Sequence, residues 1–359
     1  MAGSKKIEKE IFGTLPDGRK VERVVLRGEG GFEARIITHG AVIQALIVPD
    51  AEGRSDDVVL GHDAFAGYLA ERKFLGATVG RYANRIEKGR FSLDGESFQL
   101  PVNDGPNALH GGLEGFDRKL WNIAELDDGA SPAVTLTYAS PDGEENYPGK
   151  LDVRLIYQVT GPAELSLTME ARTDRPTIVN LTNHSFFNLE GATSGMPILD
   201  HKLMVAAEHF LAIDPAAIPL PEPPRALAGT PFDFREAHAV GARIRESDPQ
   251  LRNGRGYDHT YCLGRDGQLA LAARLEAPRS ARVMELFTDQ PGLQVYSGNY
   301  LDGTISGKGG KLMRQSDAMC LEPHNWPNSP NRPDFPSPRL DPGGVYRHHT
   351  VYRFLVSAP

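Results

Sequence analysis

An alternation of apolar and polar residues with a period of two runs through much of this chain and limits it to strand-rich folds. In residues 151–159, for example, every second side chain is apolar. Such alternation is typical of strands with one buried face. The segments that show it, or that we expect to end the chain as a strand, are 134–138, 151–159, 165–169, 269–275 and 351–356.

Candidate helices are few and short, and they lie around residues 63–71 and 236–245. The chain also contains 38 glycines and 27 prolines, which favour turns over long helices. Short strands separated by turns, with almost no strand–helix alternation, predict a large antiparallel β-sandwich. We expect residues 1–359 to form a single all-β domain, with the proline-rich segments 214–233 and 327–344 as ordered surface loops.

Composition excludes several classes of protein. The net charge of −8 gives no basic surface for nucleic acid or an anionic membrane. No apolar run approaches the roughly 18 residues of a membrane-spanning helix. Cys262 and Cys320, the only cysteines, show no zinc-site spacing and are expected to be reduced. Because the first residues lack an apolar leader, we expect no signal peptide and a cytoplasmic protein.

The familiar cofactor and nucleophile motifs are missing. Strand-like residues follow the glycine-rich segment 28–31, and the chain has no Walker A motif, no Gly-x-Ser-x-Gly elbow and no His-Glu-x-x-His motif. Four polar segments remain, at residues 80–86, 107–112, 180–188 and 321–327. They contain arginine, histidine and glutamate together with Phe186, Phe187 and Trp326. This combination suits a sugar, since charged groups bind hydroxyls and aromatic faces cover C–H surface.

These segments resemble the aldose 1-epimerase (galactose mutarotase) family. The matching runs follow in order as GRYANRI (80–86), NALHGG (107–112), FDRKLW (116–121), SPDGEENYPG (140–149), NLTNHSFFNL (180–189), GYDHTY (256–261), TDQPGLQVYSGN (288–299) and LEPHNWPNSPN (321–331). The resemblance implies a galactose mutarotase-like supersandwich. It also implies a cofactor-free isomerase, monomeric or homodimeric, that interconverts the α and β anomers of free aldohexoses and has a monosaccharide as its partner.

Roles follow from the resemblance position by position. His184 resembles the general acid that protonates the ring oxygen, and Glu322 resembles the general base that takes the proton of the C1 hydroxyl. The residues that resemble substrate-binding positions are Asn84, Arg85, His110, Asp258 and Gln290. The chain departs from the family pattern at His324 and Asn328, where glutamine and aspartate are expected. These departures concern the rim, and therefore the choice of sugar.

The chemistry needs one base and one acid. The C1 hydroxyl must lose a proton while the ring oxygen O5 gains one, and each positioned group contributes about 10²–10⁴-fold. We expect Glu322 and His184 on opposite sides of the C1–O5 unit, with the glutamate ionised and the histidine protonated in the resting enzyme. The pH profile should then be bell-shaped.

Three other hypotheses about the function remain open from the sequence. An epimerase of the same fold could act on a hexose 6-phosphate, with loops near Arg225 or residues 308–311 supplying the cations. A non-catalytic sugar-binding protein would be expected to lose the acid or the base. A metal-dependent jelly-roll enzyme could use Glu322 and His324, which share one face if the strand is regular, although Pro323 disfavours a central strand.

Overall fold

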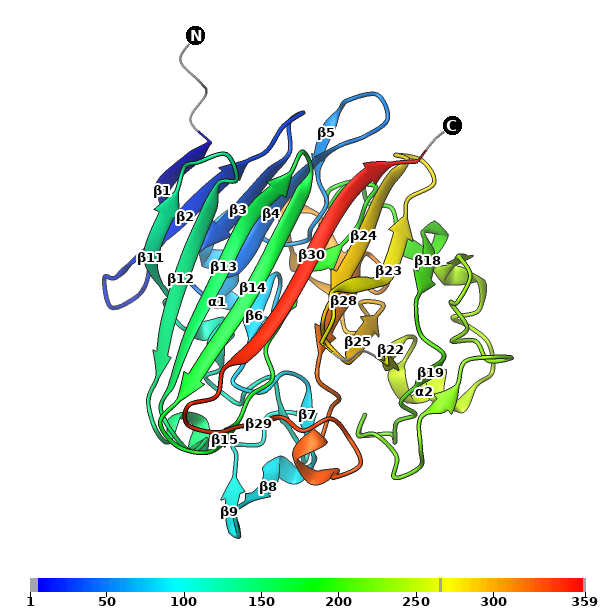
Figure 1. Cartoon of the computed structure of the whole chain (residues 1–359). Coiled ribbons are helices and arrows are strands. Elements are labelled where there is room, and N and C mark those ends of the chain that lie inside the picture. Colours follow the sequence, from blue (N-terminus) through cyan, green and yellow to red (C-terminus); the bar gives the residue numbers. More distant parts are fainter. Residues whose placement is uncertain (1–5, 265–266, 358–359) are drawn as a thin grey trace.

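A nine-stranded antiparallel sheet forms one layer of the protein in a computed structural model that describes residues 6–264 and 267–357 (Figure 1). Its strands, in spatial order, are β11 (Asn122–Asp127), β12 (Ala133–Ser140), β13 (Leu151–Gly161), β14 (Glu164–Thr173), β30 (Tyr346–Val356), β24 (Arg282–Thr288), β23 (Ala270–Glu276), β18 (Lys202–Val205) and β21 (His238–Ala239). The C-terminal strand β30 lies in the middle, between β14 and β24, and so joins the strands of residues 122–173 to those of residues 202–288.

Two smaller sheets form the second layer behind it (Figure 1). One contains β1 (Ile7–Thr14), β2 (Lys20–Arg27), β3 (Glu33–Ile37), β4 (Val42–Pro49) and β5 (Ser55–Asp57). The other contains β17 (Phe186–Phe187), β28 (Met319–His324), β25 (Gly292–Tyr296), β22 (Asp258–Cys262), β19 (His209–Phe210) and β20 (Arg225–Ala226). One apolar cluster joins the layers, with buried side chains from all three sheets such as Leu26, Leu155 and Leu321.

Short pairs and turns complete the chain. The two-stranded pairs are β6 (Ala77–Val79) with β16 (Thr182–His184), β7 (Arg85–Ile86) with β10 (Ala108–Leu109), β8 (Arg90–Leu93) with β9 (Glu96–Gln99), β15 (Thr177–Ile178) with β29 (Arg339–Leu340), and β26 (Asp302–Ser306) with β27 (Leu312–Arg314). The α-helices are α1 (Phe65–Ala70) and α2 (Pro249–Gly254), and the 3-10 turns are Glu87–Gly89, Phe116–Arg118, Glu144–Asn146, Ile198–Asp200, Val240–Ala242, Lys308–Gly310 and Ser329–Asn331. Over the described ranges, no helix is long and apolar enough to span a membrane.

The periodicity prediction is confirmed: each of the five predicted segments lies in a strand of the nine-stranded sheet, apart from residue 269, which directly precedes β23. Helix α1 lies inside the predicted segment 63–71. The helix predicted at 236–245 is wrong. His238 and Ala239 instead pair with Leu203 and Lys202 on β18, because an open sheet edge satisfies the backbone there better than an isolated helical turn would.

Alternation in the six-stranded sheet positions the site. Leu293 and Leu321 point from β25 and β28 into the apolar cluster between the layers. Their neighbours Gln294 and Glu322 therefore point to the opposite face of the same sheet, where both line a cavity. The sandwich thus uses one face of this sheet for stability and leaves the other for polar side chains.

Candidate active site

Three polar side chains of the cavity come from neighbouring strands in register. Gln294 on β25 is paired with Glu322 on β28, and Asp258 on β22 is paired with Tyr296 on β25. The Gln294 amide Nε2 donates to Asp258 Oδ1 at 2.7 Å, and its Oε1 accepts from the hydroxyl of Thr260 at 2.6 Å. Both ends of the amide are thereby fixed, so this row of polar groups is pre-organised before any ligand arrives.

The loops at 84 and 110 hold each other across a two-residue ladder. His110 N donates to Asn84 O at 3.1 Å, and Asn84 N donates to the ring nitrogen Nδ1 of His110 at 3.2 Å. Next to them Gly111 has a φ of +86°, and a Cβ there would lie 1.9 Å from Gly80 O. Only glycine fits this approach, which explains the glycine that follows the histidine in the sequence.

Arg85 is placed by a carboxylate that the sequence analysis did not identify. Its Nε donates to Asp104 Oδ2 at 2.7 Å, and the side chain is 9% exposed. Asp104 itself lines the cavity. Because the pair uses Nε, the terminal nitrogens of the guanidinium stay available for hydroxyl groups of a ligand.

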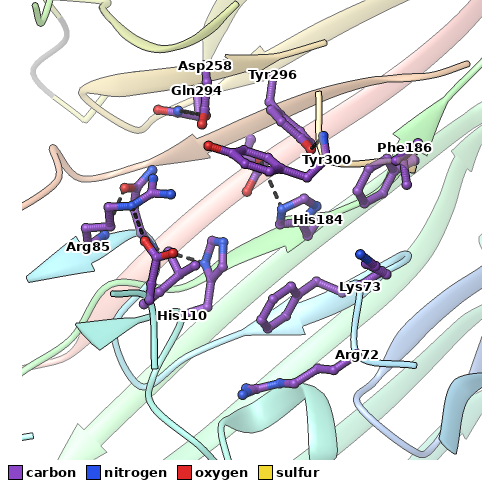
Figure 2. Close-up of a pocket in the computed structure, with 16 residues that line it drawn as sticks. Arg72, Lys73, Arg85, His110, His184, Phe186, Asp258, Gln294, Tyr296 and Tyr300 are labelled. Carbon is purple, nitrogen blue, oxygen red and sulfur yellow. Dashed lines mark hydrogen bonds and ion pairs between the residues drawn. The ribbon is translucent and has the colours of Figure 1, made fainter. Parts of the chain in front are cut away.

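His184 and Glu322 are buried neighbours. His184 Nε2 lies 3.6 Å from Glu322 Oε1, and the two side chains are 7% and 3% exposed. A dashed line from His184 in Figure 2 marks this interaction. Nδ1 of the histidine and Oε2 of the glutamate have no hydrogen-bond partner among the described residues. The two groups therefore lie next to each other in the cavity, and their action on opposite sides of the C1–O5 unit stays a prediction.

Burial sets the charge state of this pair. It raises the pKa of Glu322 well above its usual value, Asp258 adds to that rise by repulsion, and Arg85 opposes it. Burial also lowers the pKa of His184 to about 4. Both shifts favour the uncharged forms, a protonated glutamate and a neutral histidine, over the expected ionised glutamate and protonated histidine. Both arrangements hold the same number of protons and differ only in which group carries the shared one.

Asp258 belongs to the same electrostatic unit. Burial raises its pKa, whereas the nearby Arg85 and the hydrogen bond from Gln294 lower it. The positive charge of Arg85 lowers the pKa of both Asp258 and Glu322. The arginine thus offsets the electrostatic repulsion between the two carboxyl groups in this buried site.

His110, His184 and Glu322 also form a group that could be considered for a metal ion, since their ligand atoms lie within 4.8 Å of one another. The hydrogen bond to His110 determines whether this group can bind a metal ion. Because His110 Nδ1 accepts from a backbone N–H, the proton of the neutral ring resides on Nε2, which makes that nitrogen a donor. A protonated nitrogen cannot ligate a metal, so the group suits a hydroxyl better than a cation.

The cavity brings together six of the seven residues predicted for the site. Those that line it are Asn84, Arg85, His110, His184, Asp258 and Glu322. Gln290 does not reach it: its amide donates to Asp289 Oδ1 and Arg347 O on the side of the nine-stranded sheet. Gln294, four residues further on, takes its place. The signal that distinguishes them is strand register, since Gln294 pairs directly with Glu322.

Of the three aromatic residues predicted to cover a sugar, only Phe186 lines the cavity. Phe187 lies in the apolar core, and Trp326 donates from Nε1 to Pro291 O and packs on Phe335. The sequence analysis missed Phe74, Tyr296 and Tyr300, which the structure adds to the cavity wall. Phe74 stacks on the ring of His184 with centroids 5.9 Å apart.

The cations suggested for a phosphate group lie elsewhere. Arg225 forms an ion pair with Glu222 at the surface. The amine of Lys308 is buried and donates to Asp57 at 2.6 Å. Neither residue lines the cavity.

Strand β28 is regular through Pro323 because β17 pairs only with Met319 and Cys320, which leaves the proline without a partner strand on that side.

Comparison with known proteins agrees with this site. The family model described as aldose 1-epimerase matches residues 22–353. Galactose mutarotase of Bos taurus is 42% identical over 353 residues, covering 98% of this chain and 99% of that protein. Aldose 1-epimerase of Escherichia coli strain K12 is 36% identical over 344 residues, covering 95% and 97% respectively.

The fold agrees as well. The crystal structure of galactose 1-epimerase from Lactobacillus acidophilus superimposes with a TM-score of 0.86 at 28% identity, covering 99% of this chain and 100% of that one. The predicted galactose mutarotase-like sandwich is therefore confirmed. A matching family model over nearly the whole chain, full-length relatives and a shared fold lead to one conclusion: the chain belongs to the aldose 1-epimerase family, a family of isomerases.

Proposed function

We propose that this aldose 1-epimerase interconverts the α and β anomers of free aldohexoses of the glucose and galactose type, with Glu322 as the base on the C1 hydroxyl and His184 as the acid on the ring oxygen. The observation that carries the proposal is the buried pair of these two groups, 3.6 Å apart, each with an unpartnered polar atom. A free sugar supplies the hydroxyl partners that this cavity lacks.

The geometry supports a shared proton. The hydroxyl oxygen and the ring oxygen are both bonded to C1, so two protein groups next to each other can reach one oxygen each. Glu322 takes the proton of the C1 hydroxyl while His184 gives one to O5, and the C1–O5 bond breaks to leave an aldehyde. After rotation about the C1–C2 bond the ring closes on the other face, and both protons return by the reverse transfers.

The sugar itself changes the charge state that this step requires. Burial favours the protonated form of Glu322. Hydroxyl groups that donate to the carboxylate favour its ionised form, which moves the proton to His184 without any net uptake from water. Binding thus prepares the base and the acid together.

The remaining side chains bind the distal part of the ring. Arg85, Asp258 and Gln294 offer fixed donors and acceptors for neighbouring hydroxyls. His110 offers an Nε2 donor next to His184, with the two ring centroids 5.2 Å apart. Since C1 must rotate after ring opening, tight binding at the far hydroxyls with a loosely held C1 serves the reaction best.

We further propose that residues 1–359 act as a single domain, as a monomer or homodimer, in the cytoplasm. One apolar cluster extends from Ile7 to Phe354, which supports a single domain. The free cysteines Cys262 and Cys320 support a reducing compartment. Sedimentation of the purified chain distinguishes the two oligomeric states.

Polarimetry tests the function directly. Freshly dissolved α-glucose and α-galactose should reach anomeric equilibrium faster with the wild-type chain than with an equal amount of Glu322→Gln. If the variant were as fast as the wild type, Glu322 would not be the base. If neither sugar responded to the wild type, free aldohexoses would not be the substrates.

A further inference from the structure

A cation without a fixed partner lines one end of the cavity. Three basic side chains line it: Arg72, Lys73 and Arg85. Arg72 is used by Asp117, which accepts from its Nε and Nη2 at 2.8 and 2.7 Å, and by two backbone carbonyls. Arg85 is held by Asp104. Among the described residues, Lys73 forms no hydrogen bond or ion pair. Its charge lowers the pKa of Asp302 at longer range, and this effect is smaller than that of the hydrogen bonds with Thr304.

The backbone next to this lysine has an unusual conformation. Lys73 and Phe74 lie between α1 and β6, and both line the cavity. Phe74 has a φ of +57°, a left-handed conformation that is a true outlier for a bulky residue. Strain of this kind persists where the surrounding structure requires a particular placement of side chains. Here the strained residue and the lysine before it both belong to the cavity lining.

Sugar stereochemistry identifies what faces this wall. In an aldohexopyranose the ring oxygen joins C1 to C5, and the exocyclic C6 leaves from C5. With Glu322 at the C1 hydroxyl and His184 at the ring oxygen, C6 must lie on the flank of His184 that is away from Glu322. In Figure 2, Lys73 and Phe186 lie to one side of His184, and Arg85 lies to the other.

The charges of the cavity are separated along the same line. Asp258, Glu322 and Asp104 lie with Arg85 in the part that binds C1 and the far hydroxyls. Phe74 and Phe186 line the cavity together with Lys73, and Figure 2 shows Phe186 on the same side of His184 as Lys73. An anion at C6 would therefore meet a cation beside aromatic side chains, where their attraction is less screened than in water, and would lie away from Asp258, Glu322 and Asp104.

We infer that this cavity also accepts aldoses with a carboxylate at C6, that is hexuronic acids, and that Lys73 pairs with that carboxylate. The inference rests on the proposed function, because the position of C6 follows from the roles of His184 and Glu322. A carboxylate occupies nearly the same space as the hydroxymethyl group of a hexose. A phosphate is larger and carries up to two charges, which one free ammonium does not match.

The test compares an anionic and a neutral sugar in the same protein. Polarimetry from the crystalline α anomer gives kcat/KM for galacturonate and for galactose with wild type, Lys73→Gln, Lys73→Arg and Lys150→Gln. Lys150 is an exposed lysine on the outer surface, so its variant removes one charge far from the site. The quantity compared is the galacturonate-to-galactose ratio, in which any general damage to a variant cancels.

Lys73→Gln should lower this ratio about tenfold, the loss of one charge-assisted contact, while Lys73→Arg and Lys150→Gln should keep it. Added salt should lower the wild-type ratio and leave that of Lys73→Gln unchanged. An unchanged ratio in Lys73→Gln, or a wild type active on galactose and inactive on galacturonate, would overturn the inference.

Glucose 6-phosphate forms the third arm. If its turnover depended on Lys73 while that of galacturonate did not, a phosphate group would replace the carboxylate and the inference would fail. Failure of the proposed function looks different, because galactose would then not respond to the wild type, or Glu322→Gln would match the wild type. The galactose rate of Lys73→Gln shows that the variant is folded.

Discussion

Lys308 and His184 each face a buried carboxyl group, Asp57 and Glu322 respectively, and the two pairs differ in how their polar atoms are satisfied. Lys308 uses all three amine donors, to Asp57 Oδ2 at 2.6 Å, Gln44 O at 2.5 Å and Val59 O at 2.8 Å. The other oxygen of Asp57 accepts two backbone N–H groups. In the second pair the nitrogen–oxygen distance is 3.6 Å, and Nδ1 and Oε2 have no partner.

The difference separates structural from functional burial. A fully bonded buried pair holds the segments around it together, because removing one member leaves a charge without compensation. A buried pair with free polar atoms contributes little to folding, and it keeps those atoms for a ligand. Burial alone does not distinguish the two pairs. They differ in how many of their polar atoms form hydrogen bonds.

The largest expected effect concerns Glu322. Glu322→Gln should lower kcat by about 10²–10⁴-fold, since it removes the proton acceptor. It should not lower the free energy of unfolding, because burial already disfavours the charged carboxylate. Polarimetry and urea unfolding of one preparation measure both, with Glu125→Gln at an exposed position of β11 as the control. A variant that lost stability and kept its kcat would place this pair in the structural class.

Lys308→Met should give the opposite result. It leaves Asp57 buried without its cation, which should lower the free energy of unfolding by about 3 kcal/mol, while kcat of the folded protein stays unchanged. Urea unfolding measures the loss. Lys311→Met, at an exposed position three residues away, is the matched control and should change stability little. Equal losses in both variants would remove the special role of the buried pair.

A smaller effect is expected at Asp258, which binds sugar without transferring a proton. Asp258→Ala should raise KM about tenfold and change kcat less, as expected for an interaction made in both the ground state and the transition state. Because Asp258 raises the pKa of Glu322 by repulsion, the alkaline limb of the pH profile should also move to lower pH. A fall in kcat without a change in KM would contradict this role.

Much of the fold followed from local pattern. The alternation in residues 151–159 appears as β13, since a half-buried strand in a large sheet needs only one apolar face. The structure of segment 236–245 could not be predicted from local pattern, because it depends on pairing with β18, which lies more distant in the sequence. Helix α2 had a readable start, with Asp248 at the N-cap and Pro249 at the first helical position.

The site was predictable where a motif carried it, and unpredictable where it depended on register or long-range contacts. His184 and Glu322 came from their motifs. Gln290 and Gln294 lie in the same motif, and only the pairing of β25 with β28 decides which of them faces the cavity. The tautomer of His110 and the lowered pKa of His184 depend on a backbone contact and on burial, which no sequence pattern records.

We expect the buried pair of His184 and Glu322 to be neutral in the sugar-free protein and to carry one transferable proton. Nitrogen-15 NMR of the histidine rings across pH 3 to 9 tests it, with His184→Asn identifying the resonances of that ring. Burial disfavours the imidazolium form, so His184 should stay neutral at pH 7 and gain its proton only as the pH falls through its pKa of about 4. A titration of His184 centred near 6.5, the ordinary value for histidine, would contradict the account.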